Sequence, residues 1–185
     1  MEELIRKVGR VKVLIDNGMC RVGPRLDSAS ALDAALVRGA GRALLLSDAV
    51  VALCRAGRPH EALPLLRQLA AVAAAMRWIP LAQSDERARA VSSEWGCSRW
   101  DALWSDEALR ERARTAGLAE DAEAVLSSCR EFAVGGDSTL PWAHVFPENR
   151  RESLAPERVL ELAGRLMGHV LRGLDARWQG DFPGA

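Results

Sequence analysis

The chain has 185 residues, which is enough for one domain that buries about two thirds of its unfolded surface in a single core. Its 25 basic and 25 acidic side chains balance, so the chain as a whole has no field that would draw it to nucleic acid or to an anionic membrane. Binding of either kind would need a local patch. We therefore treat residues 1–185 as one domain.

The cysteines and the N-terminus predict a cytoplasmic protein. The four cysteines lie far apart, without a C-x-x-C pair or a zinc-like spacing with histidine, so we expect buried thiols in a reducing compartment. They are Cys20, Cys54, Cys97 and Cys129. The first residues, Met1–Leu4, lack the basic start and apolar core of a signal peptide, and charged residues interrupt the most apolar runs at Asp48, Arg67 and Arg77. We expect no membrane span.

A first helix is predicted over the N-terminal residues. Apolar side chains recur there at helical steps, although the short piece 11–15 would also suit a strand. They are Leu4, Val8, Val11, Ile15, Met19 and Val22. Gly23 and Pro24 end this helix, and Asp27 or Ser28 can cap the next one by accepting a backbone N–H.

Residues 30–79 predict two long helices in an antiparallel hairpin. The apolar residues of each follow alternating steps of three and four, the spacing that lines one face of a helix. They are Leu32, Leu36, Gly39, Ala43, Leu46, Val50 and Leu53 in the first helix, and Ala62, Leu66, Leu69, Ala73 and Met76 in the second. The breaker Ala-Gly-Arg-Pro at 56–59 separates the two helices, and the alanines within 70–75 permit close approach of a neighbour.

Further helix boundaries follow from capping residues. Pro80 stops the third helix, Ser84 starts a fourth, and Ser105 starts a fifth whose first turn is acidic. Gly117 ends the fifth helix, and the apolar spacing after it predicts a sixth helix that ends near Phe132.

Two tryptophan-containing regions interrupt the helices. Trp95, Trp100 and Trp104 predict a packing plug where short helices meet, with a ligand-stacking surface as the alternative. The segment 134–147 has no helical period and is rich in Gly and Pro, yet it is too apolar for a disordered linker. We expect a loop packed on the bundle, a place where function often lies.

The last helix begins near Pro156, which suits a first helical turn. Its apolar stripe is formed by Val159, Leu162, Leu166, Val170 and Leu174. Residues 179–185 follow as a tail that we expect to be frayed. Together these elements predict an all-α, single-domain helical bundle of about six or seven helices.

The sequence lacks the motifs of the common catalytic and cofactor sites. It contains no phosphate-binding Gly-rich loop, no H-E-x-x-H, no paired E-x-x-H and no G-x-S-x-G. Only three histidines are present to ligate a metal. We therefore expect neither a cofactor nor a metal site, and we expect His169 to be a partly buried histidine of the last helix.

Arg67 is a charged residue in an otherwise apolar helix, and Ala71, Ala74 and Trp78 lie at helical steps from it. Burying a guanidinium without a partner would cost on the order of several kcal/mol, so a partner must exist. Two alternatives remain. Arg67 pairs with Asp48 of the preceding helix, or it lines a pocket that binds an anion.

The anion pocket would combine Arg67 and Trp78 with Trp142 and His144 of the packed loop. Arg67 would supply a fixed positive charge, and His144 would supply a titratable donor whose pKa the neighbouring indole and backbone groups can shift. The alternative for His144 is that it only anchors its own loop.

The central hairpin resembles an uncharacterised bacterial all-helical family over about residues 31–144. The similar segments are Glu61–Ala70 running into Met76–Ile79, and a late Ser-containing segment, Asp137–Thr139, that leads to Trp142–His144. The resemblance implies a helical fold more than an activity.

That family is distantly similar to the HEPN helical superfamily, whose ribonuclease members carry an Arg, four to six residues, and then a His. Arg55 and His60 have this spacing, but they straddle an early turn, whereas the superfamily motif lies on the last long helix of the core. Arg165 and His169 lie on such a late helix but are too close together in sequence. The resemblance implies, as one alternative, a metal-independent ribonuclease that uses Arg55 and His60.

The leading interpretation is a non-catalytic helical binding or assembly module. We expect it to form a homo-oligomer or to bind a protein partner, because wide apolar helix surfaces accept further helices. RNA is the expected partner only under the ribonuclease alternative. RNA cleavage in EDTA would favour the ribonuclease, and a stable assembly without nucleic acid would favour the module.

Overall fold

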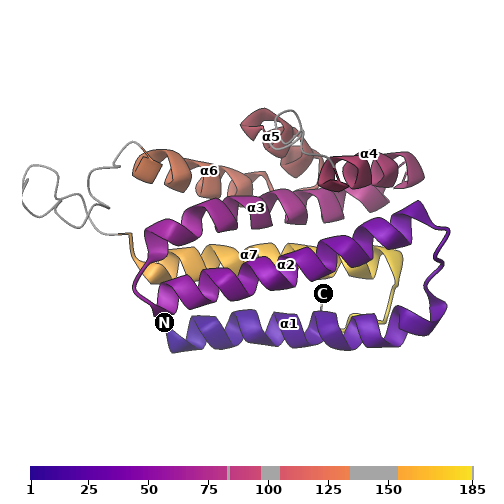
Figure 1. Cartoon of the computed structure of the whole chain (residues 1–185), viewed down its shortest axis with the longest axis horizontal. Helices are drawn as coiled ribbons and strands as arrows, with labels where there is room; N and C mark the ends of the chain where they lie inside the picture. Colours follow the sequence, from indigo (N-terminus) through magenta and orange to yellow (C-terminus); the bar gives the residue numbers. More distant parts are fainter. Residues whose placement is uncertain (83, 97–104, 134–153, 185) are drawn as a thin grey trace, which may run out of the picture.

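A computed structural model of the chain describes residues 1–82, 84–96, 105–133 and 154–184. Within these residues it contains seven α-helices, two short 3₁₀ helices and no strand (Figure 1). The α-helices are α1 (Glu2–Val22), α2 (Ala31–Arg55), α3 (Pro59–Trp78), α4 (Ser84–Gly96), α5 (Asp106–Thr115), α6 (Ala119–Ala133) and α7 (Pro156–Arg177), and the 3₁₀ helices are η1 (Gly23–Arg25) and η2 (Ile79–Leu81). The predicted all-α bundle is confirmed, as is the choice of helix over strand for residues 11–15.

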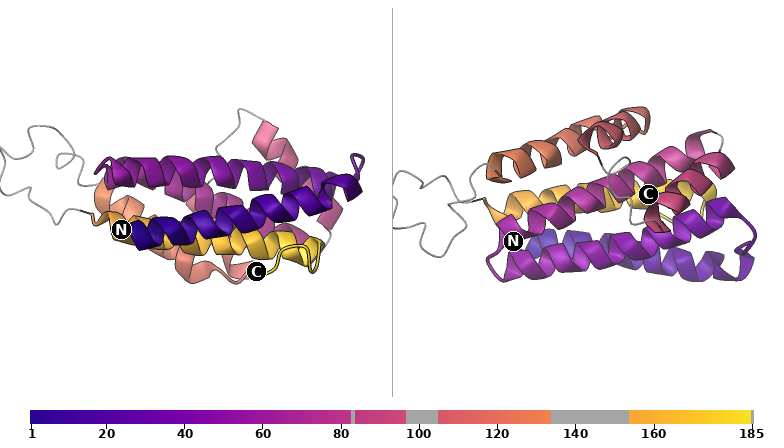
Figure 2. Two further views of the ribbon diagram at one scale, coloured as in Figure 1. Left: turned by 90° about the horizontal axis from the view of Figure 1, so that it is seen from below. Right: turned by 45° about the horizontal axis from the view of Figure 1, so that its top comes forward.

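Four long helices, α1, α2, α3 and α7, form the central bundle (Figure 1). In it α7 contacts each of the other three helices. α1, α3 and α7 run in one direction, and α2 runs opposite to them (Figure 1). α6 lies along α3 and borders α7, α5 packs on α3 and α6, and α4 packs on α2 and η2 (Figure 2).

The α2–α3 hairpin places its two apolar stripes in the core, as predicted. Val50 and Met76 are fully buried, and every residue from Ala70 to Ala75 is buried as well. This small-residue surface permits close approach of α7, because a β-carbon on Gly173 would lie only 2.7 Å from the carbonyl oxygen of Met76. The backbones of α3 and α7 therefore meet where neither side chain intervenes.

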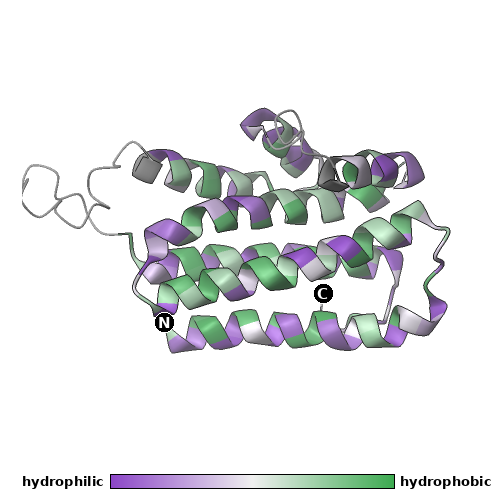
Figure 3. Ribbon diagram, viewed as in Figure 1, coloured by the Kyte–Doolittle hydropathy of each residue, from purple (hydrophilic) through white to green (hydrophobic). Residues whose placement is uncertain are grey.

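The other long helices are amphipathic or buried according to their position. Polar and apolar bands alternate along α1 (Figure 3), and its stripe residues Val8, Ile15 and Val22 face the core.

The segment Pro59–Leu81 is long and apolar enough to cross a membrane by length and composition alone. In the described fold 67% of its apolar window is buried inside the bundle, which is the burial that a core helix has.

The start of α2 differs from the prediction, because Asp27 and Ser28 do not cap it. Ser30 is the N-cap, and its hydroxyl accepts the backbone N–H of Asp33 at 3.2 Å. Asp27 instead accepts the N–H of Ala29 at 2.9 Å and closes the turn before the helix. The buried Asp33 carboxylate accepts from Arg177 Nε at 2.9 Å, which ties the end of α7 to the start of α2.

The prediction of a frayed tail is wrong for its described part. Phe182 is 1% exposed and packs in the core cluster, and the Asp181 side chain forms an ion pair with Arg25. Arg21 also donates to the Asp181 carbonyl oxygen at 2.9 Å. The tail packs because it contains one large apolar side chain and α1 offers a glycine, Gly18, beneath it.

Several predicted features lie outside the described part of the chain. These are the side chains of the cluster Trp95, Trp100 and Trp104, the thiol of Cys97, and the segment 134–147 with Trp142 and His144. Of the remaining cysteines, Cys54 is buried, Cys129 is half-buried and Cys20 is exposed, so the expectation of buried thiols is wrong for Cys20.

Candidate functional site

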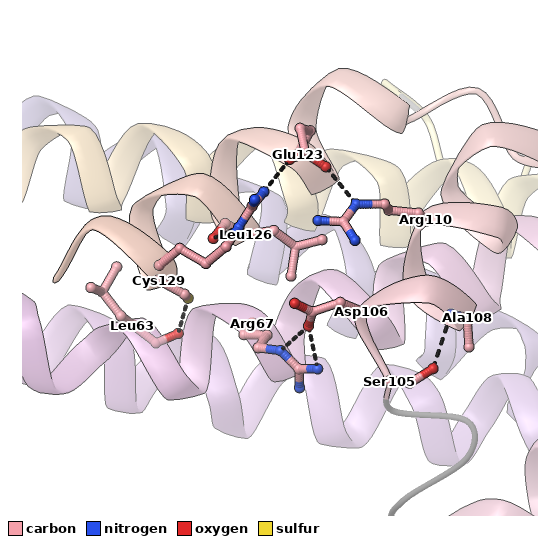
Figure 4. Close-up of polar contacts among 10 residues, drawn as sticks. Leu63, Arg67, Ser105, Asp106, Ala108, Arg110, Glu123, Leu126 and Cys129 are labelled. Carbon is pink, nitrogen blue, oxygen red and sulfur yellow. Dashed lines mark hydrogen bonds and ion pairs between the residues drawn. The ribbon is translucent and has the colours of Figure 1, made fainter. Parts of the chain in front are cut away.

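Arg67 forms an ion pair, but its partner is not the predicted one. Its Nε and Nη2 donate to Asp106 Oδ1 at 3.1 and 2.7 Å (Figure 4). Asp106 opens α5, whose N-cap Ser105 accepts the N–H of Ala108. The predicted Arg67–Asp48 pair is wrong, because Asp48 binds Lys12 of α1 instead. Asp48 and Arg67 lie at similar distances from the α2–α3 turn, but they are on different sides of the hairpin. Asp48 faces α1, where it binds Lys12, and Arg67 faces α5, where it binds Asp106.

A second polar cluster joins α5 to α6 beside this pair (Figure 4). Glu123 of α6 accepts from Arg110 Nε at 2.8 Å and also from Arg130. The hydrogen bond from Arg110 lowers the pKa of the Glu123 carboxyl. Close by, the Cys129 thiol lies 3.7 Å from the carbonyl oxygen of Leu63 on α3. These contacts are exposed or half-buried, and we interpret them as attachments of α5 and α6 to α3.

The predicted pocket of Arg67, Trp78, Trp142 and His144 is not assembled by the described residues. The guanidinium of Arg87 lies 4.3 Å from the centre of the Trp78 ring, and that of Arg112 lies 5.3 Å from it. Trp78 is also roughly 16 Å from Arg67 along α3. Trp142 and His144 lie outside the described residues, so their part in such a pocket stays a prediction.

The predicted catalytic pair, Arg55 and His60, flanks the α2–α3 turn. Arg55 is exposed at the end of α2, where its Nη2 lies 3.7 Å from Glu2 Oε2 of α1. His60 is half-buried in the first turn of α3. The ribonuclease role of the two residues stays a prediction.

A different group of side chains gathers on the outer side of α7, where this helix lies between α1 and α6. It lines an open groove with a volume of about 680 Å³, which is within the size range of small-molecule sites. The lining residues are Leu4, Lys7 and Val11 of α1, Asp121 of α6, and Leu160, Glu161, Gly164, Arg165, Gly168, His169 and Arg172 of α7. The groove therefore combines apolar walls with a few converging charges.

His169 occupies the centre of a hydrogen-bond chain in this groove. Its Nε2 lies 2.9 Å from Asp121 Oδ2, and its Nδ1 lies 3.0 Å from Arg172 Nη2. A guanidinium can only donate, so Nδ1 must be the acceptor and the proton must reside on Nε2, which donates to Asp121. Asp121 Oδ1 also accepts from Arg165 Nε at 2.9 Å. His169 is therefore held neutral and in one tautomer.

The electrostatic surroundings agree with a neutral His169. Burial lowers the pKa of His169 most strongly, and the nearby Arg172 and Arg77 lower it further, against the opposing effect of Asp121. Arg77 of α3 does not line the groove, and its own pKa is lowered by burial and by Arg172. Its Nε is buried without a hydrogen-bond partner in the described structure. This end of the groove is thus locally positive in a chain with no net charge.

Two glycines form the floor of the groove. Among the described residues, a β-carbon on Gly164 would meet only Val8, at 3.7 Å, and one on Gly168 would meet only Arg172 Nη1, at 4.0 Å. Each glycine inside a helix costs about 1 kcal/mol relative to alanine. At Gly173 the close contact with Met76 explains that cost, whereas at Gly164 and Gly168, as at Gly9 and Gly41, no contact this close is present among the described residues.

The sequence alone predicts a partly buried helical histidine at His169. Its place in a helix is confirmed, and it is buried more completely than predicted, at 7% exposure. Arg165, His169 and Arg172 lie at steps of four and three on one face of α7, and this spacing can be recognised in the sequence. The contact between Asp121 and His169 could not be predicted from the sequence, because Asp121 is 48 residues away along the chain and belongs to α6.

Comparison of the chain with protein-family models, with curated proteins and with solved structures finds no match. Within the described ranges, no three His, Cys, Asp or Glu side chains come together as a metal site would require.

Proposed function

We propose that this protein is a non-catalytic helical binding module and that its ligand binds in the groove between α1, α6 and α7. The observation that carries the proposal is the Arg172 guanidinium, which His169 holds in place at one nitrogen. In the described part of the chain its other nitrogens have no partner, and Nη1 lies over Gly168 in the open groove. A positioned donor beside apolar walls is the usual composition of a small-molecule site.

The same hydrogen-bond chain supports binding rather than catalysis. A general base needs a lone pair that faces its substrate. The lone pair of His169 is on Nδ1, where it accepts from Arg172, and the proton on Nε2 faces Asp121. Neither ring nitrogen is directed at an incoming molecule.

Self-association stays part of the proposed assembly role, but the apolar stripes that suggested it are buried within the chain. Among the described residues the large apolar side chains that remain exposed are Met1, Val13, Leu45 and Leu81. Light scattering during gel filtration tests this point. A mass above that of one chain would support the assembly role, and a strict monomer at high concentration would oppose it.

The binding proposal is tested by blocking the groove without disturbing the fold. Gly168→Leu places a side chain in the groove and replaces a poor helix former by a good one. Gly41→Leu makes the same change at a helix position where no described residue lies within 4 Å of the new β-carbon, and it lies outside the groove. In a thermal-shift screen of small molecules, we expect compounds that stabilise the wild type and Gly41→Leu but not Gly168→Leu.

Two outcomes would contradict the proposal. One is that the compounds found stabilise Gly168→Leu as well as they stabilise the wild type. The other is RNA cleavage in EDTA that is lost in His60→Ala and kept in Gly168→Leu, which would place the activity at the turn between α2 and α3.

A further inference from the structure

The proposed groove is asymmetric along α7, and this asymmetry identifies the class of ligand. At the end near Arg172, the lining guanidiniums of Arg165 and Arg172 outnumber the carboxylate of Asp121, and Arg77 of α3 adds a further positive charge near His169. Towards the start of α7 the lining contains the apolar side chains of Leu4 and Leu160, with Lys7 and Glu161 beside them. Resting on the proposed function, we infer that the groove binds an amphipathic carboxylate, with its head on Arg172 and its apolar body along Gly168 and Gly164 towards Leu160.

The head position follows from the geometry of Arg172. Its Nη2 is fixed on His169 Nδ1, and its Nη1 lies 4.0 Å from the position a β-carbon of Gly168 would take. A guanidinium fork matches a carboxylate with two parallel hydrogen bonds, and an anchored fork loses less freedom when it binds. The His169–Asp121 pair thus acts on the ligand through Arg172, as a positioning device.

The body position follows from the glycine floor. Gly168 and Leu160 are about 12 Å apart along α7, given the helical rise. Over this length Gly164 and Gly168 carry no side chain of their own and are bordered by Val8 and by the Arg172 guanidinium, so an unbranched apolar chain can lie along this side of α7. Leu4 and Val11 of α1 would flank that chain on one side.

The charges also distinguish a carboxylate from a doubly charged head. Asp121 and Glu161 line the same groove as Arg172. Three lining cations, Lys7, Arg165 and Arg172, face these two carboxylates, and this excess of one positive charge matches a singly charged head better than a phosphate monoester with two negative charges. A neutral amphiphile would form no charge-assisted hydrogen bond with Arg172.

Isothermal titration calorimetry with decanoate, decanol and acetate tests this inference on the full chain. Decanoate carries the head and the body, decanol the body alone, and acetate the head alone. We expect decanoate to bind the wild type and Gly41→Leu at least tenfold more tightly than either of the other two. Gly168→Leu should abolish decanoate binding while keeping the protein folded.

Arg172→Met should weaken decanoate roughly tenfold to a hundredfold and leave any decanol binding unchanged. Because this change leaves His169 Nδ1 without its donor, Arg172→Lys serves as a second variant, which keeps the charge but lacks the fork. It should bind decanoate more weakly than the wild type does.

The experiment distinguishes an error in the ligand class from an error in the binding site. If decanol binds as tightly as decanoate and Gly168→Leu abolishes both, the groove is a ligand site but the carboxylate inference is overturned. If decanoate binds Gly168→Leu as it binds the wild type, the groove itself is refuted as its site. The absence of any decanoate binding to the wild type would overturn the carboxylate inference, while the screen described above would still decide on the groove.

Discussion

Gly18 of α1 lies directly beneath the ring of Phe182, so closely that a β-carbon at Gly18 would be 2.2 Å from the ring. We expect Gly18→Ala to displace Phe182 and to cost about 1–3 kcal/mol of unfolding free energy, the usual cost of overpacking. Chemical denaturation measures this cost. In a Phe182→Ala background the penalty should vanish, because the ring it depends on is gone. Equal destabilisation in both backgrounds would show that the tail does not pack on α1.

The ion pair between Arg67 and Asp106 is partly exposed, at 28% and 41% of the two side chains. A double-mutant cycle with Arg67→Met and Asp106→Asn should therefore give a coupling free energy of only about 0.5–1 kcal/mol. The matched cycle of Arg67→Met with Asp48→Asn should give no coupling, because Asp48 binds Lys12. Coupling with Asp48 that exceeds the coupling with Asp106 would contradict this assignment.

His169 predicts a specific pH dependence of stability. Its pKa is lowered in the folded state, so the unfolded chain binds the proton first as the pH falls through about 6.5, the ordinary histidine value. The contribution of His169 to the unfolding free energy is therefore present above this pH. It is lost as the pH falls below this value, and the loss stops once His169 is protonated in the folded protein as well. The charged groups around His169 are Asp121 of α6 and Arg172 of α7, which bond to its ring, Arg77 of α3, and Arg165, which bonds to Asp121.

The comparison of wild type with His169→Gln checks this dependence. Between pH 7 and pH 5 the unfolding free energy of the wild type should fall more steeply, by at most about 1.4 kcal/mol per pH unit. His60 and His144 are present in both proteins, so their contributions cancel. A steeper fall in the variant would mean that His169 gains a proton on folding, which would contradict the assigned tautomer.

The cysteines should differ in reactivity according to their burial. Burial raises the pKa of the Cys54 thiol to about 11, and burial also raises that of Cys129, whereas Cys20 is exposed. In a Cys97→Ser background at pH 8, we expect iodoacetamide to label Cys20 first and Cys54 only after unfolding, as read by mass spectrometry. Labelling of Cys54 at the rate of Cys20 would contradict its burial.

The helices were predictable from the sequence because their signals are local. The stripe from Leu32 to Leu53, the cap at Ser105 and the proline at Pro156 each act within a few residues, and each prediction agrees with the structure. The prediction of a frayed tail was wrong because the burial of Phe182 depends on Gly18, which is far away in the sequence.

The candidate site was much less predictable, because it depends on how the helix faces are turned towards one another. The periodicity of α3 placed Arg67 correctly on a helix, yet its partner depended on the position of α5. The steps from Arg165 to His169 and Arg172 are visible in the sequence, but Asp121 reaches them only through the packing of α6 beside α7. Local patterns therefore predicted the elements, and the packing of distant elements produced the groove.

The location of the ligand can be measured most directly by an NMR titration of the ¹⁵N-labelled protein with decanoate, followed through its backbone amides. The amides of Gly164 and Gly168 should shift and saturate together, with Leu4 and Val11 of the facing helix, because these residues line the groove. The amide of Gly41 should stay in place. Shifts that gather instead around Gly9 and Val13, on another surface of α1, would contradict binding in the groove between α1, α6 and α7.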